Sequence, residues 1–395
     1  MNDSALNILE LKNNNRNRIF GLLRYGSLSR SELSLKTGLA KSSVTTLTAE
    51  MINEGLLREG GTAAQNGLVG RRRILLDING DYGFVFGINL HRKRISLSAV
   101  SIKGEELWSH SFSTNGLNSK SALEKIKKTL PQKTAEAGLD IKKLLGIGIA
   151  APGPLNCENG MILQPPNFKL FNNFNIVEAL WNEFGCPVVL ENDAATLATA
   201  EHCYVKEQNG SSLFVTILDG IGSALMKNGD IYGGSHGIAG ELGHISIDPF
   251  GEKCPCGNRG CLEQYATLSA LKNRFEIEDS ADLCGDNGKN SEEAEKAFEF
   301  LVNTLGTALV GAVNLFDLDT VIIYGEYATV AERLTKSLEN YIKAHSVVCR
   351  VHPVNVLPSG QNRNKAAFAA AAAGKAESGS RLSPKTGTPF SLQAE

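Results

Sequence analysis

The sequence predicts an α/β body preceded by a short, mostly helical head. Short helices around a glycine turn fill the first 55 residues, and strands alternate with helices from about residue 82 onward, which is typical of an α/β domain. Residues 1–73 carry 11 Lys and Arg against 6 Asp and Glu, a net +5; because the whole chain is −2, the rest is −7. A basic head on an acidic body predicts that only the head approaches a polyanion.

The bulk composition is that of a soluble globular protein with two or three domains. The chain has 395 residues, of which 42% are hydrophobic and 21% charged. No stretch approaches the ~18–20 uninterrupted apolar residues of a membrane span, and the first 20 residues lack the basic and apolar regions of a signal peptide. We therefore expect a cytoplasmic protein without membrane segments. Its thiols would stay reduced, so clustered cysteines would bind metal rather than form disulfides.

Residues 16–55 predict three short helices of the helix-turn-helix kind. Ser29 and Glu32 have the spacing of a capping box, which starts the second helix, and Gly38 ends this helix at a tight turn. The third helix starts near Ser42 or Ser43 and ends at Gly55. Apolar residues at three- and four-residue steps predict its buried face: Val44, Leu47 and Met51.

The other face of this third helix carries short polar side chains and a lysine, which suit phosphates and base edges. A strand, a loop and a second strand follow, which predicts a wing whose arginines bind backbone phosphates. A helical oligomerisation domain with a solvated arginine run is the alternative. The pattern, the wing and the charge favour a DNA-binding domain over residues 1–80. The predicted contacts are Lys41, Ser42, Ser43, Thr45, Thr46, Arg71, Arg72 and Arg73, and Thr48 is expected on the same outward face of the third helix.

The body alternates strands and helices along its length. We expect two strands in 83–107, a buried strand with a Gly/Pro loop in 144–155, and a strand then a helix in 186–204. A hairpin is expected in 211–234, a helix then a strand in 304–326, an Ala-rich helix in 365–376, and a flexible tail over 381–395.

Three of the eight cysteines fall within eight residues, at Cys254, Cys256 and Cys261, and His244 lies ten residues before the first. A redox pair is disfavoured, because redox motifs place two residues between the cysteines. Three thiolates and an imidazole suit a tetrahedral Zn²⁺ with a closed coordination shell, which makes the metal structural rather than catalytic. Gly257 and Gly260 would let the loop turn around the ion.

Four motifs, taken in order, resemble the ROK family of sugar kinases and sugar-responsive repressors: "APGPL" at 151–155, "ENDAATLATAE" at 191–201, "GIAGELGHISI" at 237–247 and "CPCGNRGCLEQY" at 254–265. The resemblance implies an actin-like, duplicated ribonuclease-H-like sugar-kinase fold over 81–380. Within the family, repressor members usually carry a DNA-binding head and kinases lack it. The family pattern also includes the zinc motif.

The family's kinases bind ATP through motifs that have decayed here. Their first phosphate loop reads Asp-x-Gly-Gly-Thr, whereas this chain has Asn89, Leu90, His91, Arg92 and Lys93. Bulky residues replace the glycines that let backbone N–H groups approach phosphates. Asp219 replaces a Thr in the second phosphate motif, and the adenosine-side glycine run reads Tyr-Gly-Glu at 324–326. We predict that ATP binding is lost and that the protein is not an enzyme. His91 and Arg92 are interpreted as a surface hairpin turn.

The residues that match the family's sugar-binding positions are retained. Asp193 matches the kinases' general base and would here accept a hydrogen bond from a sugar hydroxyl. Taken alone, Asp193 is also a plausible helix N-cap. The predicted sugar contacts are Asn192, Asp193, Glu241, His244 and Glu263, joined by Asn167 in the 164–171 loop. Glu241 and His244 are three apart, which places both on one face of a helical turn.

Together these observations predict a sugar-responsive transcriptional repressor, a homodimer or a dimer of dimers, whose head binds operator DNA. The alternative is an ATP-dependent sugar kinase with a fused DNA-binding domain. A third hypothesis is a DNA-binding protein that is regulated by a protein partner and keeps a vestigial pocket. The residues leave open which sugar is bound and whether it is phosphorylated.

Overall fold

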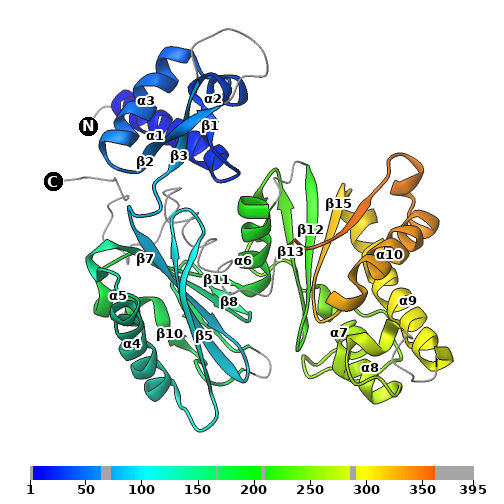
Figure 1. Ribbon diagram of the computed structural model, residues 1–395. Coiled ribbons are helices and arrows are strands. Elements are labelled where there is room, and N and C mark those ends of the chain that lie inside the picture. Colours follow the sequence, from blue (N-terminus) through cyan, green and yellow to red (C-terminus); the bar gives the residue numbers. More distant parts are fainter. Residues whose placement is uncertain (1–2, 64–72, 166–167, 206–209, 285–290, 361–395) are drawn as a thin grey trace.

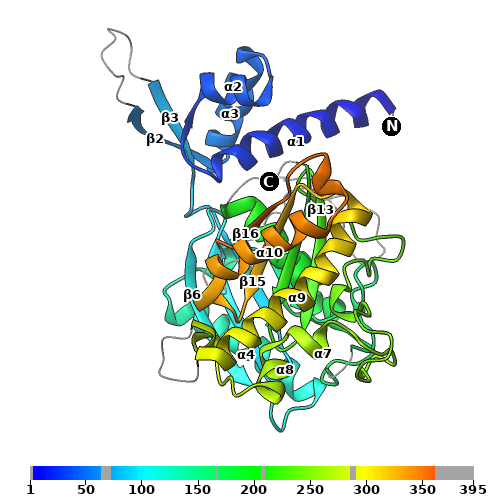
Figure 2. The same cartoon turned by 90° about the vertical axis from the view of Figure 1, so that its right-hand side faces the viewer.

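The computed structural model describes residues 3–63, 73–165, 168–205, 210–284 and 291–360. Figure 1 shows a small head and a body of two lobes, each built on its own sheet, with one helix between the two sheets. Figure 2 shows α1 extending away from the head, and the β2–β3 hairpin projecting on the opposite side. The Ala-rich segment 365–376 and the tail 381–395 lie outside the described residues.

The head has the order and turns that the sequence predicts. It contains α1 (Asp3–Leu23), β1 (Leu28–Ser29), α2 (Arg30–Thr37), α3 (Lys41–Asn53), β2 (Leu57–Ala63) and β3 (Arg73–Ile78), and its strands form an antiparallel sheet in the order β1-β3-β2. The capping box of Ser29 and Glu32 is present, and Gly38 ends α2 in the left-handed conformation with φ 70°. Two helices around this turn, followed by the β2–β3 hairpin, make a winged helix-turn-helix.

One expectation about α3 is wrong. Thr48 was expected on the exposed face of the helix, but this residue is fully buried. Its hydroxyl donates to the Val44 carbonyl at 2.8 Å and accepts from Arg30 Nε at 3.1 Å. Thr48 lies four residues after Val44 and three before Met51, which places it on the apolar stripe of the helix.

The two lobes repeat one topology. In the first lobe the sheet order is β11-β7-β4-β5-β6, in which β4, β5 and β6 are antiparallel neighbours and β7 and β11 run parallel to β4. In the second lobe the order is β14-β13-β12-β15-β16, again with an antiparallel meander followed by two parallel strands. Strand β4 thus corresponds to β12, and the β4–β5 turn corresponds to the β12–β13 turn. This is the predicted duplication.

The elements of the first lobe follow the chain closely. They are β4 (Phe84–Leu90), β5 (Arg94–Ser101), β6 (Glu106–Ser113), α4 (Ser119–Glu136), η1 (Ile141–Lys143), β7 (Leu144–Ala151), β8 (Leu155–Asn156), β9 (Met161–Ile162), β10 (Phe174–Asn175), α5 (Ile176–Phe184) and β11 (Val188–Asn192). Helices α4 and α5 pack on one face of the sheet, where their apolar residues share a core with Phe86, Ile88 and Ile149.

The elements of the second lobe are β12 (Ser211–Ile217), β13 (Ile221–Lys227), β14 (Asp230–Ile231), η3 (Leu242–His244), α7 (Glu263–Ala266), α8 (Leu268–Arg274), η4 (Ser280–Cys284), α9 (Ser291–Phe316), β15 (Thr320–Gly325), η5 (Ala328–Val330), α10 (Ala331–His345), η6 (Val348–Arg350) and β16 (Asn355–Pro358). Residues 292–316 of α9 are long and apolar enough to cross a membrane. In this structure the apolar stripe of α9, which includes Leu301, Leu305 and Leu309, is buried in the core of the lobe.

Helix α6 (Asp193–Ala200) lies between the sheets (Figure 1) and continues into a π-helical turn, η2 (Glu201–Val205). Its Ala194, Ala198 and Leu197 share one apolar cluster with Ala150 of the first lobe and Phe214 of the second. Small side chains let both sheets approach the helix closely. Helix α6 therefore contacts both lobes. It begins at the end of β11, where the predicted sugar contacts Asn192 and Asp193 lie.

Candidate functional site

The β11–α6 junction places Asn192 and Asp193 at the start of the helix. Asn192 is the N-cap of α6, and its Oδ1 accepts from the N–H of Ala194 at 2.9 Å and of Ala195 at 3.3 Å. Asp193 is therefore not the cap, although its Oδ1 also accepts from the Ala194 N–H at 2.8 Å. Because Asn192 supplies the cap, one carboxylate oxygen of Asp193 is left for a ligand.

The environment of Asp193 disfavours its charge. The pKa of this carboxyl is raised from 3.8 to about 6, mainly by burial; the Ala194 N–H lowers the pKa, the neighbouring Glu241 raises it, and Arg92 lowers it. A carboxyl with a pKa of about 6 is protonated in a fraction of molecules near neutral pH, so it can accept a hydrogen bond from a hydroxyl group or, when protonated, donate one to it.

Glu241 immediately precedes η3, a 3₁₀ turn that ends at His244, so the predicted helical turn is confirmed. A Cβ added to Gly153 would stand 3.4 Å from both Asn192 Nδ2 and Glu241 Oε1. The amide and the carboxylate therefore converge on one point beside the Gly/Pro loop, and the missing side chain leaves space there. Desolvation raises the pKa of Glu241, His244 lowers it, and Glu263 raises it.

Glu263 opens α7 and faces the β12–β13 turn. Its Oε2 accepts from the Ile221 N–H at 3.1 Å, and its Oε1 lies 3.9 Å from the Arg92 guanidinium. A Cβ on Gly220 would stand 2.5 Å from Glu263 Oε2 and 3.4 Å from Arg92 Nη2. Glycine at this position thus allows a carboxylate and a guanidinium to meet directly above the turn.

The contacts of Arg92 contradict part of the interpretation of His91 and Arg92 as a surface hairpin turn. The β4–β5 turn is a hairpin, closed by the His91 N–H on the Arg94 carbonyl at 2.9 Å. However, Arg92 Nη1 donates to the Asp219 carbonyl at 3.3 Å in the equivalent turn of the second lobe. His91 is half-buried, and this burial lowers the pKa of its imidazole to about 4. Arg92 therefore belongs to the interface between the lobes.

The four predicted metal ligands are brought together. Their ligand atoms all lie within 4.8 Å of one another. His244 Nδ1 lies 3.7 Å from Cys254 Sγ, and Cys256 Sγ lies 3.7 Å from Cys261 Sγ. Zn–S bonds of ~2.3 Å place two sulfurs of a tetrahedral site about 3.8 Å apart. The donor set and its spacing therefore fit a zinc ion.

Burial favours a cation among these sulfurs. Burial and the two neighbouring thiols raise the pKa of Cys261 to about 12, so a cation bound beside this sulfur would favour its thiolate form. The loop is closed at Gly260, where φ is 67° and an added Cβ would stand 1.7 Å from the Asp248 carbonyl oxygen. Glu263 follows Cys261 by two residues, so this loop also positions a predicted sugar contact.

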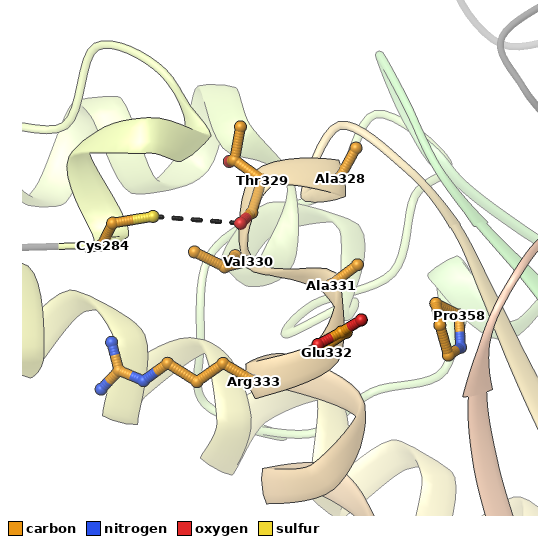
Figure 3. Close-up of a pocket in the computed structure, with 8 residues that line it drawn as sticks. All are labelled: Cys284, Ala328, Thr329, Val330, Ala331, Glu332, Arg333 and Pro358. Atoms are coloured by element: carbon orange, nitrogen blue, oxygen red, sulfur yellow. Dashed lines mark hydrogen bonds between the residues drawn. The ribbon is translucent and has the colours of Figure 1, made fainter.

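An open pocket lies near residues 324–326, at the start of α10 (Figure 3). It is lined by Cys284, Ala328, Thr329, Val330, Ala331, Glu332, Arg333 and Pro358. The Cys284 thiol contacts the Thr329 carbonyl across it at 3.9 Å. None of the predicted sugar contacts lines this pocket, so it is separate from the site at α6.

Six of the predicted DNA contacts are exposed on the head. Lys41, Ser42, Ser43, Thr45 and Thr46 are exposed on the first turns of α3, and Arg73 is exposed at the start of β3. In the described head, α2 has a side-chain cap, whereas the first turn of α3 has none. Arg71 and Arg72 lie outside the described residues, as does Asn167.

These features define a class of protein: a duplicated, actin-like α/β body with a winged helix-turn-helix at its front. A sequence model of the ROK family matches residues 85–376, and the chain belongs to the ROK family. It is 30% identical to a protein named putative xylose repressor from Caldicellulosiruptor sp. (strain Rt8B.4), over 85% of this chain and 88% of the relative. It is 26% identical to the DNA-binding transcriptional dual regulator NagC of Escherichia coli (strain K12), over 82% and 83%.

Solved structures give the same fold. A ROK family transcriptional regulator, described as a homolog of the E. coli MLC protein, superposes with a TM-score of 0.76 at 26% identity, covering 93% of this chain and 97% of its own. A ROK hexokinase from Thermus thermophilus superposes with a TM-score of 0.60 at 27% identity, covering 73% and 97%. The regulator covers more of this chain than the hexokinase does.

Proposed function

We propose that this protein is a sugar-responsive transcriptional repressor, with residues 1–80 as the DNA-binding unit and residues 81–380 as the effector unit. The similar proteins named as a putative repressor and as a transcriptional dual regulator align over more than four fifths of the chain, and the similar regulator structure covers nine tenths of it. Its place would be the cytoplasm, with operator DNA as the partner of the head.

The contact between the continuation of α6 and the head supports a coupling between sugar binding and DNA binding. Helix α6 starts with the sugar-side residues Asn192 and Asp193, and its π-helical continuation contacts the head, because the Tyr25 hydroxyl donates a hydrogen bond to the His202 carbonyl. π-Helical turns occur frequently at functional sites. A ligand that shifts the first turn of α6 would act on the head through this contact, changing the balance between DNA-competent and DNA-incompetent states.

In the sugar site, carboxylates and an amide would accept and donate hydrogen bonds to hydroxyl groups. Asp193, Glu241 and Glu263 supply the acceptors, and Asn192 Nδ2 supplies donors. A site of this kind discriminates strongly between sugars, because a missing hydroxyl leaves buried polar groups unpaired. Zinc, held by His244 and the three cysteines, would supply the positive charge that keeps the loop closed. His244 Nδ1 is the nitrogen nearest Cys254, so Nε2 would remain available for the sugar.

On the head, Lys41 and the uncapped first turn of α3 would meet a backbone phosphate, while Ser42, Thr45 and Thr46 would reach base edges. Two heads in a two-fold dimer, or in a dimer of dimers, would read half-sites about 34–36 Å apart. Multi-angle light scattering of the full chain, with and without a two-fold DNA duplex, measures this assembly.

The test is a DNA-binding titration of the full-length protein on a duplex selected from a random library by the protein itself. We expect a sugar or a sugar phosphate to change the affinity for DNA at least tenfold. Tyr25→Phe is expected to retain DNA affinity but to reduce the ligand effect, whereas Tyr232→Phe, an exposed tyrosine of the second lobe, should behave as wild type. No change with any sugar or sugar phosphate would contradict the proposal.

The kinase alternative is disfavoured by the residues that stand where ATP phosphates would bind. Arg92 spans the two hairpin turns, and the Asn89 amide occupies the place of a carboxylate. Incubation with ATP, Mg²⁺ and a panel of hexoses, followed by measurement of ADP, is expected to give no turnover. ADP release that depends on both a hexose and Asp193 would establish the kinase instead.

A further inference from the structure

The metal loop presents one of its three cysteines to solvent. Cys254 is 6% exposed and Cys261 is fully buried, whereas Cys256 is exposed, in a turn that the Gly257 N–H closes on the Cys254 carbonyl at 3.0 Å. The thiolate character and the accessibility of a cysteine determine how readily it is oxidised. A cysteine that binds a metal does so as a thiolate. Cys256 therefore combines both properties, and a purely structural metal site gives this exposure no purpose.

The exposed sulfur already lies beside a second one. Cys256 Sγ is 3.7 Å from Cys261 Sγ, and a disulfide bond of about 2.05 Å requires the two sulfurs to approach by about 1.7 Å. The Cys254 sulfur has other contacts. It lies 3.7 Å from His244 Nδ1 and accepts from the Gln264 amide at 3.7 Å. Cys261 is therefore the partner within reach of an oxidised Cys256.

The backbone between the two cysteines allows this approach. Gly257 follows Cys256 with φ 99°, and a Cβ added to it would meet no atom of the described residues within 4 Å. At the other end of the segment, Gly260 precedes Cys261 and is tightly packed, because an added Cβ would stand 1.7 Å from the Asp248 carbonyl oxygen. The open turn lets Cys256 move, while the packed residue before Cys261 keeps the second sulfur in place.

We propose that Cys256 is an oxidation site, at which a hydroperoxide joins Cys256 to Cys261 in a disulfide and thereby releases the metal. This inference rests on the proposed zinc site and goes beyond the proposed function. The Cys256 thiolate attacks one oxygen of the hydroperoxide: an S–O bond forms, the O–O bond breaks, and the leaving oxygen takes a proton to give water or an alcohol.

The second step closes the disulfide. The Cys261 thiolate attacks the sulfenic sulfur of Cys256, an S–S bond forms, the S–O bond breaks, and the departing hydroxide takes a proton to give water. The two thiolates supply the two electrons that reduce the hydroperoxide. No further oxidant is needed.

The loss of two thiolates leaves the metal with His244 and Cys254 alone, too few for a closed tetrahedral shell, so the zinc ion dissociates. Two of the proposed sugar contacts flank the loop: Glu241 stands three residues before His244, and Glu263 stands two residues after Cys261. Oxidation therefore loosens both ends of the loop that positions these carboxylates. Reduction by a thiol, with zinc present, reverses the change.

The experiment treats the zinc-loaded, full-length protein with hydrogen peroxide and follows zinc release with a colour-forming chelator. Free thiols are then blocked, and peptide mass spectrometry identifies the cysteines that are joined. The variant is Cys256→His, which keeps four possible metal ligands but removes the exposed thiol. Its matched control is Cys284→Ser, which removes an exposed cysteine outside the cluster. The effect of sugars on DNA affinity is measured before and after oxidation.

We expect peroxide to release one zinc ion per wild-type chain and to join Cys256 to Cys261 in the same proportion. Cys256→His should bind zinc and release it at least tenfold more slowly, whereas Cys284→Ser should release it as wild type does. The oxidised wild type should melt at a lower temperature and lose its response to sugar. Dithiothreitol with added zinc should restore the metal content and the melting temperature.

The inference is overturned if peroxide leaves the zinc in place, if wild type and Cys256→His release it at equal rates, or if the disulfide joins Cys254 to either neighbour. Mass spectrometry of wild type identifies the joined pair by itself, so the test also holds if Cys256→His fails to bind zinc. A wild type that binds no zinc under reducing conditions contradicts both the zinc site and this inference. A protein that releases zinc as expected, but whose DNA affinity no sugar changes before oxidation, contradicts the proposed function alone.

Discussion

Replacing Asp193 by Asn should make the ligand-free protein more stable and less responsive. The pKa of Asp193 rises from 3.8 to about 6 on folding, so ionisation of this group opposes folding at neutral pH. Each pKa unit corresponds to about 1.4 kcal/mol, which gives about 3 kcal/mol as the largest gain for a neutral isostere at pH 8. Asn keeps the Oδ1 that accepts from the Ala194 N–H, so the local hydrogen bond is preserved.

The sign of the effect follows from linkage. At about pH 2, well below both pKa values, Asp193 is protonated in both states, so the variant gains nothing. As the pH rises from 4 to 6, the unfolded chain ionises first and the folded protein loses stability relative to it, and above pH 6 the full penalty applies. At pH 5 the expected gain is about half of that at pH 8.

Urea unfolding followed by tryptophan fluorescence measures this gain. Both tryptophans, Trp108 and Trp181, lie in the first lobe, to which Asp193 is joined through β11. Asp230→Asn, at an exposed carboxylate of the second lobe, is the control and should change little at either pH. An Asp193→Asn protein that is destabilised, or that gains equally at pH 5 and pH 8, would refute the reasoning.

The remaining predictions concern the metal loop and the head. Metal analysis should find one zinc ion per chain in the wild type, and Cys261→Ser should lose this ion and unfold at a lower temperature. The control is Cys284→Ser, at an exposed cysteine outside the cluster, which should keep the zinc ion and the wild-type melting temperature. Gly260→Ala should lose more than about 2 kcal/mol, because an added Cβ would collide with a carbonyl. Gly257→Ala should lose only about 1 kcal/mol for its positive φ; equal losses in urea unfolding would contradict the collision. Lys41→Gln should reduce the slope of log K against log salt for DNA by about 0.9, and an unchanged slope would place Lys41 away from phosphate.

Local patterns predicted most of the head and the metal loop. The capping box at Ser29, the glycine stop at Gly38 and the His244–Cys261 spacing depend on residues close together in sequence, where backbone geometry limits the outcomes. The error at Thr48 was avoidable, because the helical period already places it between Val44 and Met51 on the buried face.

The role of Arg92 could not be predicted from local patterns. Its partner Asp219 is 127 residues away, and the contact arises because the two hairpin turns are equivalent positions in a duplicated fold. The sequence did signal an unusual turn, because Arg92 stands where the phosphate loop of the family's kinases has a glycine. Likewise, the sequence indicated Asp193 as a possible N-cap of α6, whereas the structure assigns the cap to Asn192, since the Asn192 side-chain oxygen accepts from two N–H groups of the first turn.

The head's apolar core is completed by residues of the body. Ile102 is 1% exposed within that core, Leu145 and Tyr82 pack against it, and Lys103 pairs with Asp77 of β3 at 2.7 Å. Fusing this head to another effector body would therefore leave a cavity in the core of the head, unless the new body supplied an apolar side chain equivalent to Ile102 at its β5–β6 turn. Exchange of operator specificity between related regulators is accordingly easier by changing the exposed side chains of α3 than by transplanting the whole head.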